Sequence, residues 1–310
     1  MALVSVVGAA GRQGLAQMRQ LSSAGYKVRA LSRAANPDFG GANTVDEVRY
    51  FDLHDEATFV SAFEGSDAIF YTKPLLEMGA GPDLAARLGS AAVTAGATRF
   101  VWNTSGWIPD KPGDPGAYGA STPAINALFR SGVPATVFGS VLFMDNLLTN
   151  WARPFIVHED RYVYAHNPHL EANWISLDDV GKCMVAALDR PDLEGAWMNI
   201  GGPETLKPTD VVAVLSRVFG RAIKYDPCTP EEFGDLLVDA LGDSVAPEAR
   251  TAFSAGIAAF YHYNNDTLLK PFKVNAEVVQ ERLPEVKFET LEQWVARQDW
   301  SDEAHRPSAG

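Results

Sequence analysis

Short runs of aliphatic, β-branched and aromatic residues alternate with stretches of helical periodicity along the N-terminal part of the chain. Strands that alternate with helices predict a parallel sheet with crossover helices. The strands are expected at residues 3–7, 27–32, 48–51, 68–71, 99–102 and 133–138.

Helical periodicity fills the segments between these runs. Leu84, Leu88 and Ala92 recur at a spacing of four before a stop at Gly96, which predicts one crossover helix. Further helices are expected from residue 15 onward and at 123–130, 143–151 and 180–188. Beyond residue 203 the strand pattern thins out, and helices are expected at 207–219, 230–241 and 247–262. The pattern predicts an α/β fold, a doubly wound parallel sheet with a smaller, mainly helical C-terminal lobe.

The first expected strand leads directly into a glycine-rich turn. Gly8, Gly11 and Gly14 are spaced three apart, and a helical pattern follows at once. Glycine lets the backbone turn sharply and approach a ligand closely, and a helix start offers unpaired N–H groups to a phosphate. The spacing G-x-x-G-x-x-G differs from the dinucleotide fingerprint G-x-G-x-x-G. Because strand, turn and helix occur together, we interpret the segment as the dinucleotide-binding turn of a Rossmann-like sheet, in preference to a purely structural turn.

The end of the second strand indicates which dinucleotide is bound. Ser32 and Arg33 stand there, and Arg33 lies 19 residues after Gly14. An acidic residue near this position accepts the ribose 2′-hydroxyl of NAD, whereas an arginine accommodates the 2′-phosphate of NADP. Arg12, inside the glycine turn, adds a second cation. We therefore expect NADP (as NADPH) rather than NAD; the alternative is that Arg33 is an ordinary solvated surface residue.

Polar residues collect after the other strands. Ligands of open α/β sheets bind outside the carboxyl ends of the strands, so these residues are candidates for cofactor contacts. Asp52 is expected to contact the adenine amine with Leu53 against the ring, although Asp52 or Asp55 could instead cap the next helix. The expected cofactor-binding residues are Gly8, Ala10, Gly11, Arg12, Gln13, Gly14, Ser32, Arg33, Asp52, Leu53, Thr72, Lys73 and Asn103.

The domain organisation follows from these patterns. An NAD(P)-binding Rossmann domain is expected at residues 1–155, and residues 175–202 are expected to return to it. Residues 156–174 and 203–300 form the expected substrate-binding lobe, and 301–310 a frayed tail. The loop at 107–118 is rich in turn-forming residues and is interpreted as a lid or pocket wall.

Composition narrows the classes of partner and location. The net charge of −13 argues against nucleic acid and anionic membranes, which attract basic surfaces. Two cysteines make no disulfide framework, no basic leader precedes the first strand, and no apolar run is long enough to span a membrane. We expect a cytoplasmic protein that binds a small-molecule substrate; a homodimer or a regulatory protein partner stays open. His166 and His169, with His158 and Glu159 upstream, resemble a metal cluster, but their spacing lies in a turn and commits no full set of four ligands, so no metal is expected.

Several segments together resemble the NmrA-like family, an atypical branch of the short-chain dehydrogenases and reductases. They are the glycine turn, Ser32 with Arg33, and residues 99–102, 131–136, 143–148, 175–182, 199–204 and 291–295. Each motif alone is weak, but their order is specific. The resemblance implies that the glycine turn and Arg33 bind NADP(H), with Thr72 and Lys73 alongside.

The same resemblance implies a set of catalytic residues, and this sequence departs from the family pattern at one of them. Short-chain reductases use a Tyr-x-x-x-Lys pair with a nearby serine, and here Tyr118 and Ser105 match the tyrosine and the serine. Thr122 stands where the lysine is expected, so no ammonium group follows Tyr118 at that spacing. A phenol has a pKa near 10, which a neighbouring cation lowers. Lys73 or Lys111 could supply that charge; otherwise Tyr118 acts as a neutral acid or has no chemical role.

Two functions remain open. One is an NADPH-dependent reductase that delivers hydride to a carbonyl, imine or activated alkene of a medium-sized apolar or aromatic molecule. In it Ser105 orients the substrate and Tyr118 donates the proton. The other is a non-catalytic NADP(H)-binding redox sensor or regulatory protein, which the absence of lysine at residue 122 favours.

Overall fold

The computed structural model describes residues 1–34, 36–39, 45–72, 81–111 and 118–305. The chain divides into two units. The first comprises residues 1–141, 177–200 and 277–287, and the second comprises residues 142–176, 201–276 and 288–310. Among the described residues, no helix is long and apolar enough to cross a membrane.

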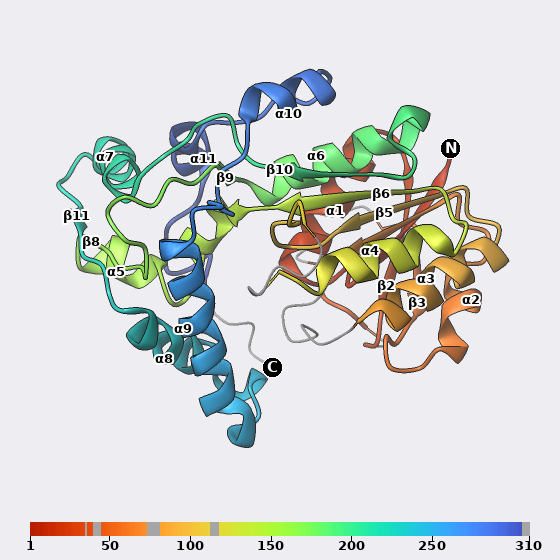
Figure 1. The fold of residues 1–310 in the computed structure, drawn as a ribbon, viewed down its shortest axis with the longest axis horizontal. Helices are drawn as coiled ribbons and strands as arrows, with labels where there is room; N and C mark the ends of the chain where they lie inside the picture. Colours follow the sequence, from red (N-terminus) through yellow and green to blue (C-terminus); the bar gives the residue numbers. More distant parts are fainter. Residues whose placement is uncertain (35, 40–44, 73–80, 112–117, 306–310) are drawn as a thin grey trace. The chain divides into compact units, whose positions relative to one another are not determined.

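A seven-stranded parallel sheet forms the first unit (Figure 1). Its strand order is β10-β6-β5-β4-β1-β2-β3. The order reverses beside β1, so the carboxyl ends of β1 and β4 flank a topological switch point, where ligands of such folds bind. The strands are β1 (Leu3–Val7), β2 (Lys27–Ser32), β3 (Glu47–Tyr50), β4 (Ala68–Thr72), β5 (Arg99–Asn103), β6 (Ala135–Ser140) and β10 (Ala196–Ile200).

Helices cover both faces of this sheet. Helices α1 and α6 pack against each other, and α3 contacts both α2 and α4. The bounds are α1 (Arg12–Ser23), α2 (Ala57–Phe63), α3 (Pro82–Thr94), α4 (Ser121–Arg130) and α6 (Leu177–Ala186). The apolar side chains beneath α2, α3 and α4 form one continuous core that includes Phe63, Leu88 and Trp102. This arrangement confirms the expected doubly wound parallel sheet.

The second unit is mainly helical. Its helices include α5 (Arg153–His158), α7 (Pro208–Phe219), α8 (Pro230–Leu241), α9 (Arg250–Asp266) and α11 (Leu291–Arg297). Helix α8 packs on α9, and α7 packs on α11. Two short pairs of parallel strands are also present: β7 (Leu142–Phe143) pairs with β9 (Trp174–Ile175), and β8 (Arg161–Tyr162) pairs with β11 (Lys224–Tyr225). Helix α10 (Ala276–Arg282) begins where the chain leaves this unit. An aromatic core with Tyr164, Phe233 and Trp294 fills the interior.

Two expectations about elements need correction. The helix expected at residues 143–151 is wrong: Phe143 belongs to β7, and a short 3-10 turn follows at Met144–Leu148. Phe143 pairs with Ile175, a partner far along the chain, and this pairing overrides the local helical pattern. The seventh strand of the sheet, β10, was not expected because its burial is only partial, with Trp197 39% exposed.

Candidate functional site

The turn between β1 and α1 requires glycine at two positions, Gly8 and Gly14. Gly8 adopts φ +70°, in the left-handed region that favours glycine, and its carbonyl accepts a hydrogen bond from the Gly11 amide at 3.0 Å. A Cβ at Gly14 would lie 2.4 Å from that carbonyl oxygen and 2.7 Å from the Ala9 Cα. Helix and strand therefore approach as closely as their backbones allow, and only glycine fits at residue 14.

The N-terminus of α1 is shaped to receive an anion. Gly11 is its N-cap, no side chain caps the first turn, and no acidic residue lies there. The residues Gly8, Ala10, Gly11 and Arg12 are exposed. The first N–H groups of a helix need partners from outside it, and the helix dipole favours a negative one. The residues present fit the pyrophosphate of a dinucleotide, which would lie against this turn.

A buried polar network joins the glycine turn to the end of β5. Asn103 is fully buried, and its Nδ2 donates to the Gln13 Oε1 at 2.7 Å. The Gln13 Nε2 donates to the Ser105 Oγ at 3.0 Å. The Asn103 Oδ1 accepts hydrogen bonds from the Ser140 hydroxyl at 2.8 Å and from the Ser105 amide at 3.1 Å. Three of the expected site residues are thus brought together, with Ser140 as an additional member.

Thr72 lies beside Asn103 on the neighbouring strand, where the two residues pair in register. The Gln17 Nε2 of α1 donates to the Thr72 Oγ1 at 2.6 Å, so α1 is also tied to β4. Gln17 is almost completely buried, and its Oε1 has no hydrogen-bond partner. Lys73 lies outside the described residues.

The ends of β2 and β3 lie side by side, since Ser32 and Tyr50 pair in register. Arg33 is exposed at this edge, and the Ser32 hydroxyl accepts a hydrogen bond from the Ala34 amide at 3.1 Å. One oxygen of Asp52 accepts a hydrogen bond from the His54 amide at 3.0 Å and so closes its own turn. The backbone amide of Ala57, the first residue of α2, donates to Asp55 at 3.2 Å. Leu53, half-buried, packs against the core under this edge.

Tyr118 lies against the loop that follows β5. Its ring is only 5% exposed and packs edge-on against Trp107, with the ring centroids 5.5 Å apart. Its Cε1 atom would lie 3.3 Å from a Cβ at Gly106, directly after Ser105. The structure therefore places Tyr118 next to the segment that carries Ser105. Residues 112–117 of the expected lid lie outside the described residues.

Thr122 is the second residue of α4, four positions after Tyr118. Its hydroxyl oxygen is buried and has no hydrogen-bond partner. An unpaired buried hydroxyl supplies no positive charge, so Thr122 cannot replace an ammonium group. Of the two lysines that could compensate, Lys111 is exposed and Lys73 is not described.

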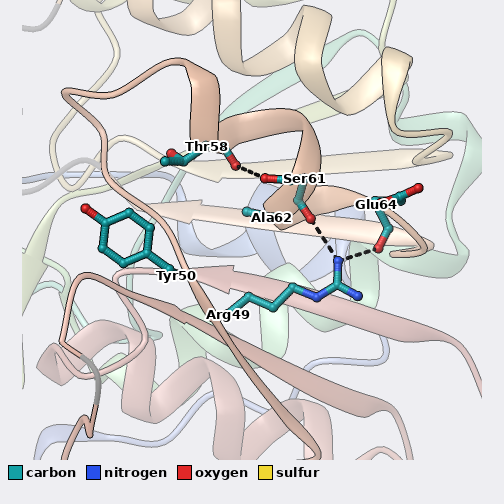
Figure 2. A pocket seen from close by; sticks show the side chains of 6 residues that line it. All are labelled: Arg49, Tyr50, Thr58, Ser61, Ala62 and Glu64. Carbon is teal, nitrogen blue, oxygen red and sulfur yellow. Dashed lines mark hydrogen bonds between the residues drawn. The ribbon is translucent and has the colours of Figure 1, made fainter.

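A groove on the outer strand is separate from this network. It measures about 410 Å³ and is lined by Arg49, Tyr50, Thr58, Ser61, Ala62 and Glu64. Figure 2 shows the Arg49 guanidinium directed at the last turn of α2, where it donates to the carbonyls of Ser61 at 2.8 Å and Glu64 at 3.1 Å. Arg49 therefore caps α2, and β2 separates this strand from the glycine turn.

His166, in the histidine-rich segment of the second unit, lies in an aromatic core. His166 is 2% exposed and stacks on Tyr164, with ring centroids 4.2 Å apart, while its Nδ1 lies 3.0 Å from the Tyr162 hydroxyl. Burial lowers the pKa of His166 to about 3, which keeps the ring neutral. Within the described ranges, no group of three His, Cys, Asp or Glu residues is arranged to hold a metal ion.

The sheet, its strand order and the glycine turn place the chain among the Rossmann-like α/β proteins. A model of the NmrA-like family matches residues 1–295. The chain is 31% identical over 236 residues to an NAD(P)H azoreductase of Xenophilus azovorans, a match that covers 74% of this chain and 78% of the azoreductase. The chain belongs to the NmrA-like family.

Solved structures share this fold at low sequence identity. The triphenylmethane reductase of Citrobacter sp., complexed with NADP(H), has a TM-score of 0.72 at 17% identity, covering 94% of this chain and 98% of that one. NmrA, a negative transcriptional regulator in complex with NAD, has a TM-score of 0.68 at 16% identity, covering 96% and 98% of the two chains. The fold is therefore shared by a reductase and by a regulator.

Proposed function

We propose that the protein is an NADPH-dependent reductase that delivers hydride to a carbonyl, imine or activated alkene of a medium-sized apolar or aromatic molecule. The observation that carries this proposal is the uncapped first turn of α1, tied through Gln13 to Ser105 at the end of β5. A phosphate-binding turn and a hydroxyl group suited to a substrate are thereby held in one network. The similarity to a protein named as an azoreductase supports reduction and extends the candidate acceptors to azo compounds.

The dinucleotide would be held by the glycine turn and by the end of β2. Gly8 and Gly11 keep the turn free of side chains that would hold the pyrophosphate away, and Gly14 lets the helix approach the strand, since a side chain there would collide with the backbone of Gly8 and Ala9. Arg33 is exposed beside Ser32 and can form a bidentate pair with a 2′-phosphate. When bound, the reduced nicotinamide supplies the hydride.

Ser105 and Tyr118 act on the acceptor. Ser105 donates a hydrogen bond to the oxygen or nitrogen that takes up the electron pair, which stabilises the charge that develops there. Tyr118 donates its phenolic proton to the same atom. A phenol is protonated at neutral pH, so it is in the form that reduction requires without a neighbouring lysine. Without a cation at residue 122 the phenolate that forms on Tyr118 is less stabilised, so Tyr118 is a weaker acid than in a Tyr-x-x-x-Lys pair.

A second function, a redox sensor or regulator that binds NADP(H) without turnover, is favoured by one observation. Thr122 replaces the lysine of the reductase pair, and its buried hydroxyl has no partner. General acid–base groups contribute about 10²–10⁴-fold to a rate, so a defective pair could leave only binding.

One experiment distinguishes the two functions. Consumption of NADPH is followed with a panel of aromatic aldehydes, ketones, quinones, imines and azo compounds. For a reductase, Tyr118→Phe lowers the rate by about 10²-fold or more while NADPH affinity is retained. The matched control is Tyr50→Phe, because Tyr50 is 59% exposed on the outer strand, and this variant keeps the wild-type rate. A sensor instead binds NADPH and NADP⁺ with clearly different affinities and consumes NADPH with none of the panel, a result that would exclude the reductase function.

A further inference from the structure

Gln13 occupies the point at which the glycine turn meets the end of β5. It is the second residue of α1, so its backbone lies in the helix turn that is open to a phosphate. Its side-chain amide reaches in the other direction, to Asn103 at 2.7 Å and Ser105 at 3.0 Å. One residue therefore belongs both to the glycine turn and to the hydrogen-bond network around Ser105.

The directions of these hydrogen bonds follow from donor chemistry. The backbone amide of Ser105 can only donate, so the Asn103 atom that it contacts at 3.1 Å is the carbonyl oxygen Oδ1. The Asn103 Nδ2 must then face Gln13, and the Gln13 atom that it meets is the acceptor Oε1. This leaves the Gln13 Nε2 to donate to the Ser105 Oγ. The Ser105 oxygen is the acceptor in this contact, and its own hydrogen is not used by Gln13.

The backbone of Ser105 depends on the same network. Ser105 adopts φ +58°, a left-handed conformation that residues other than glycine rarely adopt. Its amide is held by Asn103, whose Oδ1 is also bound by the Ser140 hydroxyl at 2.8 Å. The buried Asn103 thus holds the Ser105 backbone, while Gln13 holds the hydroxyl.

We propose that Gln13 is a positioning residue: its side-chain amide donates to the Ser105 Oγ and thereby fixes the orientation of the serine hydroxyl. Through its place in the first turn of α1, it also links this orientation to dinucleotide binding. The proposal rests on the proposed function, in which Ser105 contacts the atom that accepts the proton.

A mutant cycle tests the positioning role. Gln13→Met keeps the length of the side chain and removes its hydrogen bonds to Asn103 and Ser105. The matched control is Gln20→Met on the same helix, because the side-chain amide of Gln20 donates to Asp178 at 3.3 Å and not to this network. We expect Gln13→Met to lower kcat about tenfold, with less than about a threefold change in acceptor KM and in NADPH affinity. Gln20→Met leaves all three unchanged.

The cycle is completed with Ser105→Ala. If Gln13 acts through Ser105, the double variant is no slower than Ser105→Ala alone, within about twofold. A double variant whose loss of kcat equals the product of the two single-variant losses would refute the positioning role. A Gln13→Met variant that loses NADPH affinity but keeps kcat would also refute it.

Hydrogen exchange tests the link without any turnover. We expect saturating NADPH to slow exchange at the Ser105 amide by about threefold or more in the wild type, and much less in Gln13→Met. Equal slowing in both proteins refutes the link. If no acceptor is reduced but the exchange difference is present, the reductase function fails and the link between the two segments stands.

Discussion

Replacement of Gly14 by alanine is the most direct test of the cofactor turn. The added Cβ would lie 2.4 Å from the Gly8 carbonyl oxygen, 2.7 Å from the Ala9 Cα and 2.8 Å from the Ala9 carbonyl carbon. All three atoms belong to the backbone, so no flexible side chain can move aside. The β1–α1 turn must shift, and overpacking of this kind costs about 1–3 kcal/mol. We expect the free energy of unfolding to fall by about 2 kcal/mol or more.

Gly11→Ala is the matched control in the same turn. A Cβ there meets only the Gly8 carbonyl oxygen, at 3.3 Å, and Gly11 has φ −78°, which alanine adopts without strain. We expect a loss below about 1 kcal/mol, typical of a changed N-cap. Urea denaturation of the two variants gives the difference, and dinucleotide titration of each folded protein gives the effect on binding. Equal stability and equal NADPH affinity in the two variants would refute the close approach of strand and helix.

The remaining predictions concern the choice of cofactor, the buried His166 in the core of the second unit, and the close approach of Gly202 to Trp174 in that unit. Arg33→Ala weakens NADPH binding about tenfold or more and NADH binding little; equal losses would exclude a 2′-phosphate contact. Burial lowers the folded pKa of His166 to about 3, so its neutral form stabilises the fold above the unfolded pKa of 6.5, and this contribution is lost as the pH falls from 6.5 toward 3. Denaturation at pH 7 and pH 5 therefore shows a smaller acid loss for His166→Phe than for the wild type. A Cβ at Gly202 would lie 1.9 Å from the Trp174 carbonyl oxygen, so Gly202→Ala destabilises strongly, whereas Gly256→Ala, with no atom near its Cβ, does not.

The parallel sheet could be predicted because most of its strands carry short runs rich in aliphatic, β-branched and aromatic residues. β1 and β6 are buried along their whole lengths, so each run stands out from the helical patterns beside it. β10 lacks this signal: it lies at the edge of the sheet, and its residues are mostly half-exposed. β7 carries only two residues, and its pairing with β9 joins positions that are distant in sequence. Local periodicity holds no information on such pairing.

The candidate site was predictable position by position but not as a network. Thr72 and Asn103 were identified because they end strands, and parallel strands bring their carboxyl ends to one edge. Ser140 ends β6 in the same way, so the same criterion would have found it. The contacts of Gln13 with Asn103 and Ser105 span about 90 residues of sequence and depend on side-chain rotamers, which no spacing rule encodes.

The cofactor turn and the catalytic pair make separable contributions to function. The glycine turn, the uncapped helix and the Gln13 network suit a dinucleotide equally in an enzyme and in a sensor, so they do not distinguish the two. The distinction lies at Tyr118 and Thr122. A threonine hydroxyl can donate at most one hydrogen bond to a phenolate and carries no charge, whereas a lysine ammonium adds the positive charge that lowers the pKa of a phenol. In the proposed reaction Tyr118 is the acid in reduction and the base in oxidation, and both directions pass through the same proton-transfer transition state. The replacement of lysine by threonine, which leaves the phenolate poorly stabilised, therefore slows both directions and favours the sensor over the enzyme.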